Sequence, residues 1–274
     1  IIPNTFHNNY YYKDFRENLI DNFNIDKILD VRYKVFEDAE MGYTSIPFFS
    51  KTKDPESNSK LARLESSDLI STLEFFEMKQ DNFKNFPDSK FLFQKPLMEI
   101  WFKAEKDSEF LGNGELFSFY NGTKTGNNSK YIVDEKESDI CKPVLRGKDF
   151  YRYLLQPHEK FIVFDKENLW SNTNDSHFIV DSKLLIRRTS DHLAVAYDNN
   201  QSYVLDTVHL LYSHTENYKN SYLLALLNSK LFHLLYRLIV PEGGKAFAEV
   251  KITNLKNLPI KKCGIPEQEL IGKK

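Results

Sequence analysis

Two stretches in the second half of the sequence place positive side chains among small, amide and aromatic residues, a combination suited to binding phosphates and base edges. The first, NGTKTGNNSKYIV (121–133), sets Gly, Thr and Asn between two expected strands, with Lys124 and Lys130 at its flanks. Small residues let a backbone approach a ligand closely, and amide and hydroxyl groups can hydrogen bond to phosphates or base edges. An ordinary surface hairpin has the same composition, so this loop alone identifies no function.

The second stretch, KPVLRGKDFYRY (142–153), adds Arg146, Lys148 and Arg152 beside three aromatic residues, and the pair Arg187-Arg188 ends an expected strand. Arginine can form two parallel hydrogen bonds to guanine or to phosphate. These cations therefore extend the candidate anion-binding region beyond the first loop.

Acid-x-lysine tripeptides offer a different chemistry. The sequences EVK (249–251) and DSK (181–183) have the form found in metal-dependent nucleases, where a second carboxylate helps to hold the metal and the lysine activates water. Asp88 is the candidate for that second carboxylate. Because such tripeptides are frequent by chance in a charged sequence, a nuclease using Glu249 and Lys251 is an alternative and not the leading interpretation.

No complete catalytic or metal-binding set accompanies these tripeptides. The sequence contains no G-x-S-x-G and no H-E-x-x-H, and GTKTG (122–126) and EGGKAF (242–247) lack the Gly-Lys-Ser/Thr ending of a phosphate-binding loop. The 7 histidines and 2 cysteines stand without metal-ligand spacing. We therefore predict no metal site and no catalytic residue in this chain.

The composition is that of a globular chain. Of the 274 residues 41% are hydrophobic, 14% aromatic and 28% charged, which excludes collagen-like, mucin-like and wholly disordered classes. Cys141 and Cys263 cannot build a disulfide framework, so we expect a reducing, cytoplasmic location. The most apolar window, 222–240, includes polar and charged residues and has apolar residues three and four apart, which predicts a core helix and no membrane partner.

Charge is uneven along the chain. Residues 1–140 hold 18 Lys and Arg against 25 Asp and Glu, residues 141–274 hold 19 against 14, and the formal net charge is -2. A basic segment can hold a polyanion, because displacing counterions from phosphates rewards clustered Lys and Arg. A solvated surface would show the same imbalance.

The elements that must position these residues follow from periodicity and turn residues. They predict an α+β fold class, a mixed-sheet domain with helices preceded by a short α/β piece. The expected helices and mostly helical regions are 14–23, 66–106 and 219–238, and the polar tract 50–60 is expected to be a linker. The expected strands are 28–31, 43–49, 115–121, 130–134, 160–164, 178–180, 183–188, 192–197, 202–206 and 246–250.

The order of the motifs resembles a known family. The succession NGTKTGNNSKYIV, CKPVLRGKDFYRY, SKLLIRRTSDHLAVAYDNN, LDTVHLLY, SYLLALLNSKLFHLLYR and KITNLKNLPI is similar to the TaqI-like C-terminal specificity domain over roughly residues 111–261. That domain is the DNA target-recognition module of adenine-specific methyltransferases, including restriction-modification enzymes of type IIG. The resemblance implies a target-recognition domain that binds double-stranded DNA.

The front of the chain resembles the end of a Rossmann-like catalytic domain of the same methyltransferases, through IIPNTF, KDFRENLIDNF, KILDV and VFEDAEMGYTSIPFF. In that family a Phe in the position of Phe36 packs against a flipped-out adenine, because the amino group cannot be reached in the stacked duplex. A core residue beside Val35 is the alternative interpretation of Phe36.

Two motifs of that family do not occur in these residues. They are Asn-Pro-Pro-Tyr, which orients the target amino group, and the glycine-rich turn that binds S-adenosylmethionine. We expect both upstream of Ile1, in a longer product of which this chain is a fragment. The resemblance thus implies S-adenosylmethionine for the full-length parent, no cofactor in this chain, and no methylation by this chain alone; whether a nuclease is fused to the parent stays open.

The prediction divides the chain into a methyltransferase remnant (1–55), a helical connector (56–110), a DNA target-recognition domain (111–262) and a tail (263–274). A protein-interaction domain, with the acidic front docking a partner subunit, is the remaining alternative. The residues predicted to face DNA are Lys124, Thr125, Asn127, Asn128, Arg146, Lys148, Arg152, Arg187, Arg188 and Lys245.

Overall fold

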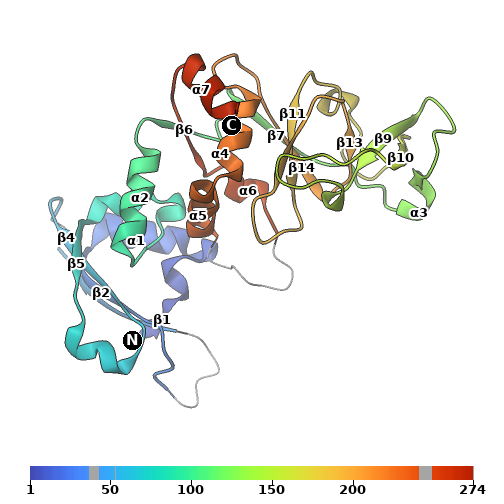
Figure 1. Ribbon diagram of the computed structural model, residues 1–274. Coiled ribbons are helices and arrows are strands. Elements are labelled where there is room, and N and C mark those ends of the chain that lie inside the picture. The colour runs from blue at the N-terminus through green and yellow to red at the C-terminus, as the bar shows by residue number, and fades with distance from the viewer. Residues whose placement is uncertain (37–42, 53, 241–248, 274) are drawn as a thin grey trace. The chain divides into compact units, whose positions relative to one another are not determined.

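The computed structural model describes residues 1–36, 43–52, 54–240 and 249–273, and it divides into two compact units, residues 1–103 and 104–274 (Figure 1). Both units combine helices with small sheets, which confirms the predicted α+β class. No helix among these described ranges is long and apolar enough to cross a membrane.

Unit 1 is built on one mixed sheet with the strand order β1-β3-β2-β4-β5. The central strands β2 and β4 run parallel, and the other neighbours are antiparallel. Ile25, Ile28 and Val31 of β2 are buried, as are Leu19 and Ile20 of the helix α1, so the apolar side chains of both elements lie in the core. The elements of this unit are β1 (Ile2–Pro3), α1 (Lys13–Asn22), β2 (Asn24–Val31), β3 (Thr44–Ser50), β4 (Asn58–Leu64), β5 (Phe76–Lys79) and α2 (Lys95–Glu105).

The prediction of a mostly helical segment at 66–106 is wrong over its first part. Only α2 at its end is an α-helix; the residues before it form β5 and three short 3-10 helices, η3 (Ser67–Thr72), η4 (Gln80–Asn85) and η5 (Pro87–Ser89). No residue of η3 is buried, and Leu69 and Ile70 are exposed, so the apolar spacing there does not reflect a buried helix face. The polar tract 50–60 likewise ends in β4, which pairs with β2 of the same sheet.

A polar cluster lies inside unit 1 around Asp30, a fully buried residue on β2. Its carboxylate accepts a hydrogen bond from Asn4 Nδ2 at 2.9 Å and pairs with Arg32 Nε at 2.6 Å and Arg63 Nε at 3.1 Å. The buried ring of His7 lies 3.5 Å away and contacts Ser45. Such a charge is tolerated in a core only because several donors surround it.

The described residues of unit 2 form three small sheets with the orders β13-β9-β10-β8, β12-β11-β14-β7 and β15-β6. Strands lie at the expected positions 115–121, 160–164, 183–188, 192–197 and 202–206. Of 130–134 only 132–133 is a strand, 178–180 and 249–250 are not strands, and 246–248 lie outside the described residues. The strands are β6 (Ser108–Phe110), β7 (Phe117–Asn121), β8 (Ile132–Val133), β9 (Cys141–Leu145), β10 (Lys160–Val163), β11 (Lys183–Arg187), β12 (Val195–Asp198), β13 (Tyr203–Val204), β14 (Val208–Ser213) and β15 (Pro259–Lys261).

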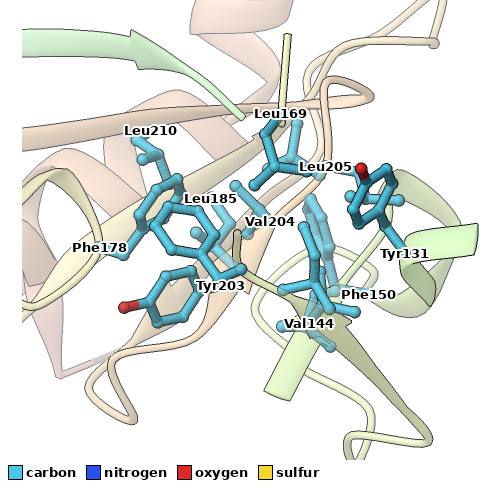
Figure 2. Packing of buried hydrophobic residues seen from close by; sticks show 14 of the residues in the cluster. Tyr131, Val144, Phe150, Leu169, Phe178, Leu185, Tyr203, Val204, Leu205 and Leu210 are labelled. Atoms are coloured by element: carbon cyan, nitrogen blue, oxygen red, sulfur yellow. The ribbon is translucent and has the colours of Figure 1, made fainter. Parts of the chain in front are cut away.

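A hydrophobic core joins the two four-stranded sheets of unit 2 (Figure 2). Phe178 is fully buried, and its ring stacks on that of Tyr203 at a centroid distance of 4.7 Å. The apolar side chain at 178 therefore belongs to the core although 178–180 is not a strand. Val144, Leu185 and Leu210 bring β9, β11 and β14 into the same cluster. Their burial fixes where the loops at the strand ends emerge.

The single long helix expected at 219–238 is two helices, α4 (Asn220–Asn228) and α5 (Lys230–Ile239). Ser229 is extended, and its hydroxyl accepts a hydrogen bond from the backbone N–H of Phe232 as the N-cap of α5. The buried Asn228 side chain donates to the carbonyl of Val195 and accepts from its N–H, so Asn228 and Ser229 serve packing and capping. Two further helices follow: α6 (Ile252–Leu255) and α7 (Ile265–Gly272), which packs on α4 (Figure 1).

Candidate nucleic-acid interface

The predicted cationic segments of unit 2 meet at one chain segment, Val204–Thr207. The N–H of Thr123 donates to the carbonyl of Val204 at 2.8 Å, and the N–H of Asp206 donates to the carbonyl of Thr123 at 2.9 Å. The N–H of Arg188 donates to the carbonyl of Thr207 at 2.9 Å. Segments separated by more than 60 residues in sequence are therefore joined backbone to backbone.

Glycines permit this close approach. A Cβ on Gly122 would lie 2.0 Å from the carbonyl oxygen of Leu205, and a Cβ on Gly147 would lie 2.9 Å from the carbonyl oxygen of Thr207. The N–H of Gly147 also donates to the Thr207 hydroxyl at 3.0 Å. Any larger side chain at 122 would have to push two backbones apart.

Arg146 is held by its own turn. Its Nε donates to Asp149 Oδ2 at 2.8 Å, its Nη2 to Oδ1 at 3.0 Å, and its backbone N–H to Oδ2 at 2.8 Å. Hydrogen bonding to Asp149 raises the already high pKa of Arg146, against the opposing effect of partial burial. The guanidinium thus stabilises the 3-10 turn η6 (Gly147–Asp149), and its charge is largely offset.

Arg187 and Arg188 point to different surroundings, as alternate residues of a strand do. The guanidinium of Arg188 donates to Glu249 at 2.9 Å and to the carbonyl of Asp206 at 3.1 Å. Arg187 donates to the carbonyl of Phe150, and its guanidinium carbon lies 5.6 Å from the Phe150 ring centroid and 5.5 Å from that of Tyr151. Its Nε is buried and has no hydrogen-bond partner among the described residues.

Arg187 and Arg152 line one open cleft of about 470 Å³ together with Tyr151, His192 and Ala194. Arg152 is exposed, and its Nε donates to the carbonyl of Leu193 at 3.0 Å, a neutral partner that leaves its charge in place. Two guanidinium groups beside an exposed tyrosine suit a phosphate with an attached sugar and base.

His192, which lines this cleft, has a second histidine as its neighbour. The rings of His192 and His233 have centroids 6.5 Å apart. Burial lowers the pKa of His233, and the positive charges of Arg237 and Arg152 lower it further. The neutral form of the His233 ring is therefore favoured, against the opposing charge of Asp191.

The loop 121–133 is more ordered than its composition suggests. Thr125 is buried and donates to Asn128 Oδ1 at 2.6 Å, while Asn127 accepts from the N–H of Lys130 as the N-cap of the short helix α3 (Asn128–Tyr131). Lys124 is exposed, with its Nζ 5.4 Å from the ring centroid of Trp170. Of these predicted residues Lys124 is thus best placed for a ligand.

Three further predicted site residues remain. Lys148 is exposed in η6. Phe36 belongs to unit 1 and is 52% exposed, so it is not a core residue beside Val35. Lys245 lies outside the described residues. The structure thus brings Arg152 and Arg187 to one cleft. The Arg146 turn and Arg188 are both hydrogen bonded to the segment Val204–Thr207.

Sequence reasoning missed three residues of this region. Trp170 is 69% exposed beside Lys124, Thr207 bonds to the turn of Arg146, and His192 lines the cleft. The motif LDTVHLLY contained a signal for Thr207, because Asp and Thr interrupt an apolar run there. Trp170 carried none, since an isolated aromatic residue is first assigned to a core.

The nuclease alternative finds no support in the local geometry. The carboxylate of Glu249 pairs with Arg188, and Lys183 of the second tripeptide is fully buried, with its Nζ 2.6 Å from Asp198. Burial lowers the pKa of Lys183, against the attraction of Asp198, and the amine is held by Asp198 and the carbonyl of Phe178. Among the described residues no three His, Cys, Asp or Glu side chains gather as a metal site would require.

Comparison with solved structures finds distant neighbours. They include the type IIG restriction endonuclease BpuSI (12% identity, TM-score 0.46, 99% of this chain and 41% of that one) and the DNA complex of the type IIL restriction-modification enzyme MmeI (11%, 0.48, 98% and 39%). The HsdS subunit from Thermoanaerobacter tengcongensis matches at 15% identity and a TM-score of 0.40, over 65% of this chain and 43% of that one. At this level of similarity the neighbours do not assign residue roles.

This chain spans about two fifths of the length of those solved structures. No curated protein matches it. The model of one family, the TaqI-like C-terminal specificity domain, matches residues 142–260. That range contains the cleft, the Arg146 turn and the segment Val204–Thr207. Residues 142–260 of this chain therefore match the TaqI-like C-terminal specificity domain, the family that the order of motifs indicated.

Proposed function

We propose that this chain recognises a specific sequence in double-stranded DNA, as the specificity part of a restriction-modification enzyme whose catalytic part is an adenine-specific methyltransferase. The family match over residues 142–260 carries the proposal, because it covers the cleft of Arg152 and Arg187. Guanidinium groups can hold phosphates or guanine edges, and the loop residues around them can supply base contacts.

The proposal assigns the chemistry to other parts of the parent enzyme. This chain contains neither Asn-Pro-Pro-Tyr nor a glycine-rich turn for S-adenosylmethionine, so that cofactor would be held by a catalytic domain outside these 274 residues. Phe36 would pack against an adenine turned out of the duplex. Its 52% exposure supports this role, since a buried ring could not reach a base.

Binding of the 274-residue chain to a pool of fluorescent duplexes, each with a random central segment, tests the proposal. Bound duplexes are recovered, sequenced and compared with the starting pool. We expect one short motif to be enriched, and affinity for it to fall by orders of magnitude as salt rises from about 50 to 200 mM, because phosphate binding releases counterions. Absence of binding at low salt, or binding without any enriched motif, would contradict sequence-specific recognition.

A further inference from the structure

Trp170 is the most exposed tryptophan of the chain and has no role in the hydrophobic core. Of the 2 tryptophans in the sequence, Trp101 is fully buried in unit 1, whereas 69% of Trp170 is exposed. Trp is highly buried on average, and exposed aromatic rings that are held in place are typical of binding surfaces.

The ring is held in place by the loop that contains Gly126. The N–H of Trp170 donates to the carbonyl of Lys124 at 2.8 Å, and the N–H of Lys124 donates to the carbonyl of Ser171 at 3.3 Å. A Cβ on Gly126 would lie 2.2 Å from indole ring atoms, so the indole rests on the bare backbone of this glycine. Gly126 also has φ +75°, which disfavours any other residue.

Two further hydrogen bonds join the loop that contains Gly126 to the loop that contains Trp170. The hydroxyl of Thr123 donates to the carbonyl of Asn172 at 3.0 Å, and the Asn172 side chain donates to the carbonyl of Asn121 at 2.5 Å. Because the backbone is fixed on both sides of Trp170, little conformational freedom is left for binding to remove. The exposed indole is thus ready to contact a ligand.

The neighbouring charge indicates the ligand class. Lys124 Nζ lies over the indole ring, 5.4 Å from its centroid, and Lys124 is exposed, so a cation and an exposed aromatic ring are offered together. A nucleotide matches both, with its base on the indole and its phosphate on the ammonium group. An apolar peptide would use the ring and leave the charge unpaired.

We propose that Trp170 and Lys124 form a nucleotide-binding corner, in which the indole stacks on a base and Lys124 pairs with the adjoining phosphate. This inference rests on the proposed DNA-binding function and adds to it a contact outside the cleft. The faces of bases are covered inside an intact duplex, so the indole takes a base that has left the stack in the bound DNA.

The intrinsic fluorescence of the chain tests this directly. Acrylamide should quench the exposed Trp170 and leave the buried Trp101 nearly unaffected. With the duplex enriched above, we expect the quenchable fraction to disappear as DNA binds, followed in parallel by the anisotropy of labelled DNA. Binding by anisotropy with Trp170 still fully quenchable would overturn the inference and leave the proposed function intact; no binding at all would overturn both.

Variants separate stacking from charge. We expect Trp170→Ala to weaken DNA binding by about tenfold or more, Trp170→Phe to weaken it less, and Lys124→Ala to weaken it and flatten its salt dependence. Tyr11→Ala, which removes an 89% exposed ring from unit 1, is the matched control and should bind like the unaltered chain. A DNA affinity of Trp170→Ala equal to that of Tyr11→Ala, with both variants folded by circular dichroism, would refute the corner.

Discussion

Individual arginines of the interface differ in how much charge they can offer to a polyanion. Arg146 and Arg188 are each paired with a carboxylate, so their positive charge is offset within the protein. Arg152 bonds to a backbone carbonyl and Arg187 lies over aromatic rings, and neither of these contacts supplies a negative charge. The positive potential of the cleft is therefore due mainly to Arg152 and Arg187. The sequence alone does not distinguish these two arginines from the two that are paired with carboxylates.

Arg152→Ala should accordingly weaken DNA binding without affecting the fold. We expect the slope of log affinity against log salt to become shallower by about one, as for the loss of one phosphate contact. Lys95→Ala, which removes one exposed positive charge from unit 1, is the control and should leave the slope unchanged. Titrations of labelled duplex at several salt concentrations measure both, and equal slopes for Arg152→Ala and the unaltered chain would remove Arg152 from the interface.

At the scale of elements, the interface depends on backbones that approach each other across long stretches of sequence. The segment Val204–Thr207 is bonded to Thr123, to the turn at Gly147 and to Arg188. The bonds to Thr123 and Arg188 are made by main-chain groups, which every residue type carries, whereas the bond to Gly147 uses the Thr207 hydroxyl. They position the cationic side chains by fixing the strand ends from which those side chains project.

Gly122→Ala should therefore destabilise unit 2. The new Cβ would meet the carbonyl oxygen of Leu205 at 2.0 Å, and overpacking of this kind costs about 1–3 kcal/mol or more. Gly114→Ala is the matched control, because nothing lies within 4 Å of its added Cβ. Thermal unfolding followed by the exposed Trp170 compares the two variants; a melting temperature of Gly122→Ala as high as that of Gly114→Ala would show that the two backbones are not held together in solution.

The helices and strands differ in how far their sequence pattern predicts them. The strand β11 was predictable because its apolar side chains are consecutive and buried, whereas β14, which has the same pattern, was not among the expected strands. The break at Ser229 was not, since apolar spacing of three and four continues across it and only the capping hydroxyl marks the new helix. The contacts at Val204–Thr207 produce no periodic pattern in the sequence. Hydrogen bonds between main-chain groups that are distant in sequence require no particular residue type, except glycine where two backbones come close.

For the whole molecule, the charge asymmetry of the sequence does not follow the structural division. Residues 1–103 hold 14 Lys and Arg against 17 Asp and Glu, and residues 104–274 hold 23 against 22. The acidic stretch before residue 141 belongs to the same unit as the arginine cleft. Attraction to DNA must then come from the local cleft and loop charges of unit 2 and not from its net charge.

Each unit contains one tryptophan, Trp101 in unit 1 and Trp170 in unit 2, so the stability of the units can be followed separately in single-tryptophan variants. Asp30 contributes to the acid response of unit 1. Burial alone would raise the pKa of Asp30, but the contacts with His7 and Asn4 and the charge of Arg32 hold it well below its usual range. A depressed carboxyl pKa stabilises the fold above the ordinary value of 3.8, and this stabilisation is lost progressively as pH falls below it.

Asp30→Asn should thus lower the stability of unit 1 at pH 7 by about 3 kcal/mol, because it removes one partner of a buried ion pair. The stability of the variant should also depend less on pH below about 4, where Asp30 of the unaltered chain takes up its proton in the unfolded state but not in the folded state. Urea unfolding from pH 3 to 7, followed by Trp101 in the Trp170→Phe background, measures both effects. Asp68→Asn, at an exposed carboxylate of the same unit, is the control. If Asp30→Asn unfolds like Asp68→Asn at every pH, the buried cluster does not hold unit 1 together.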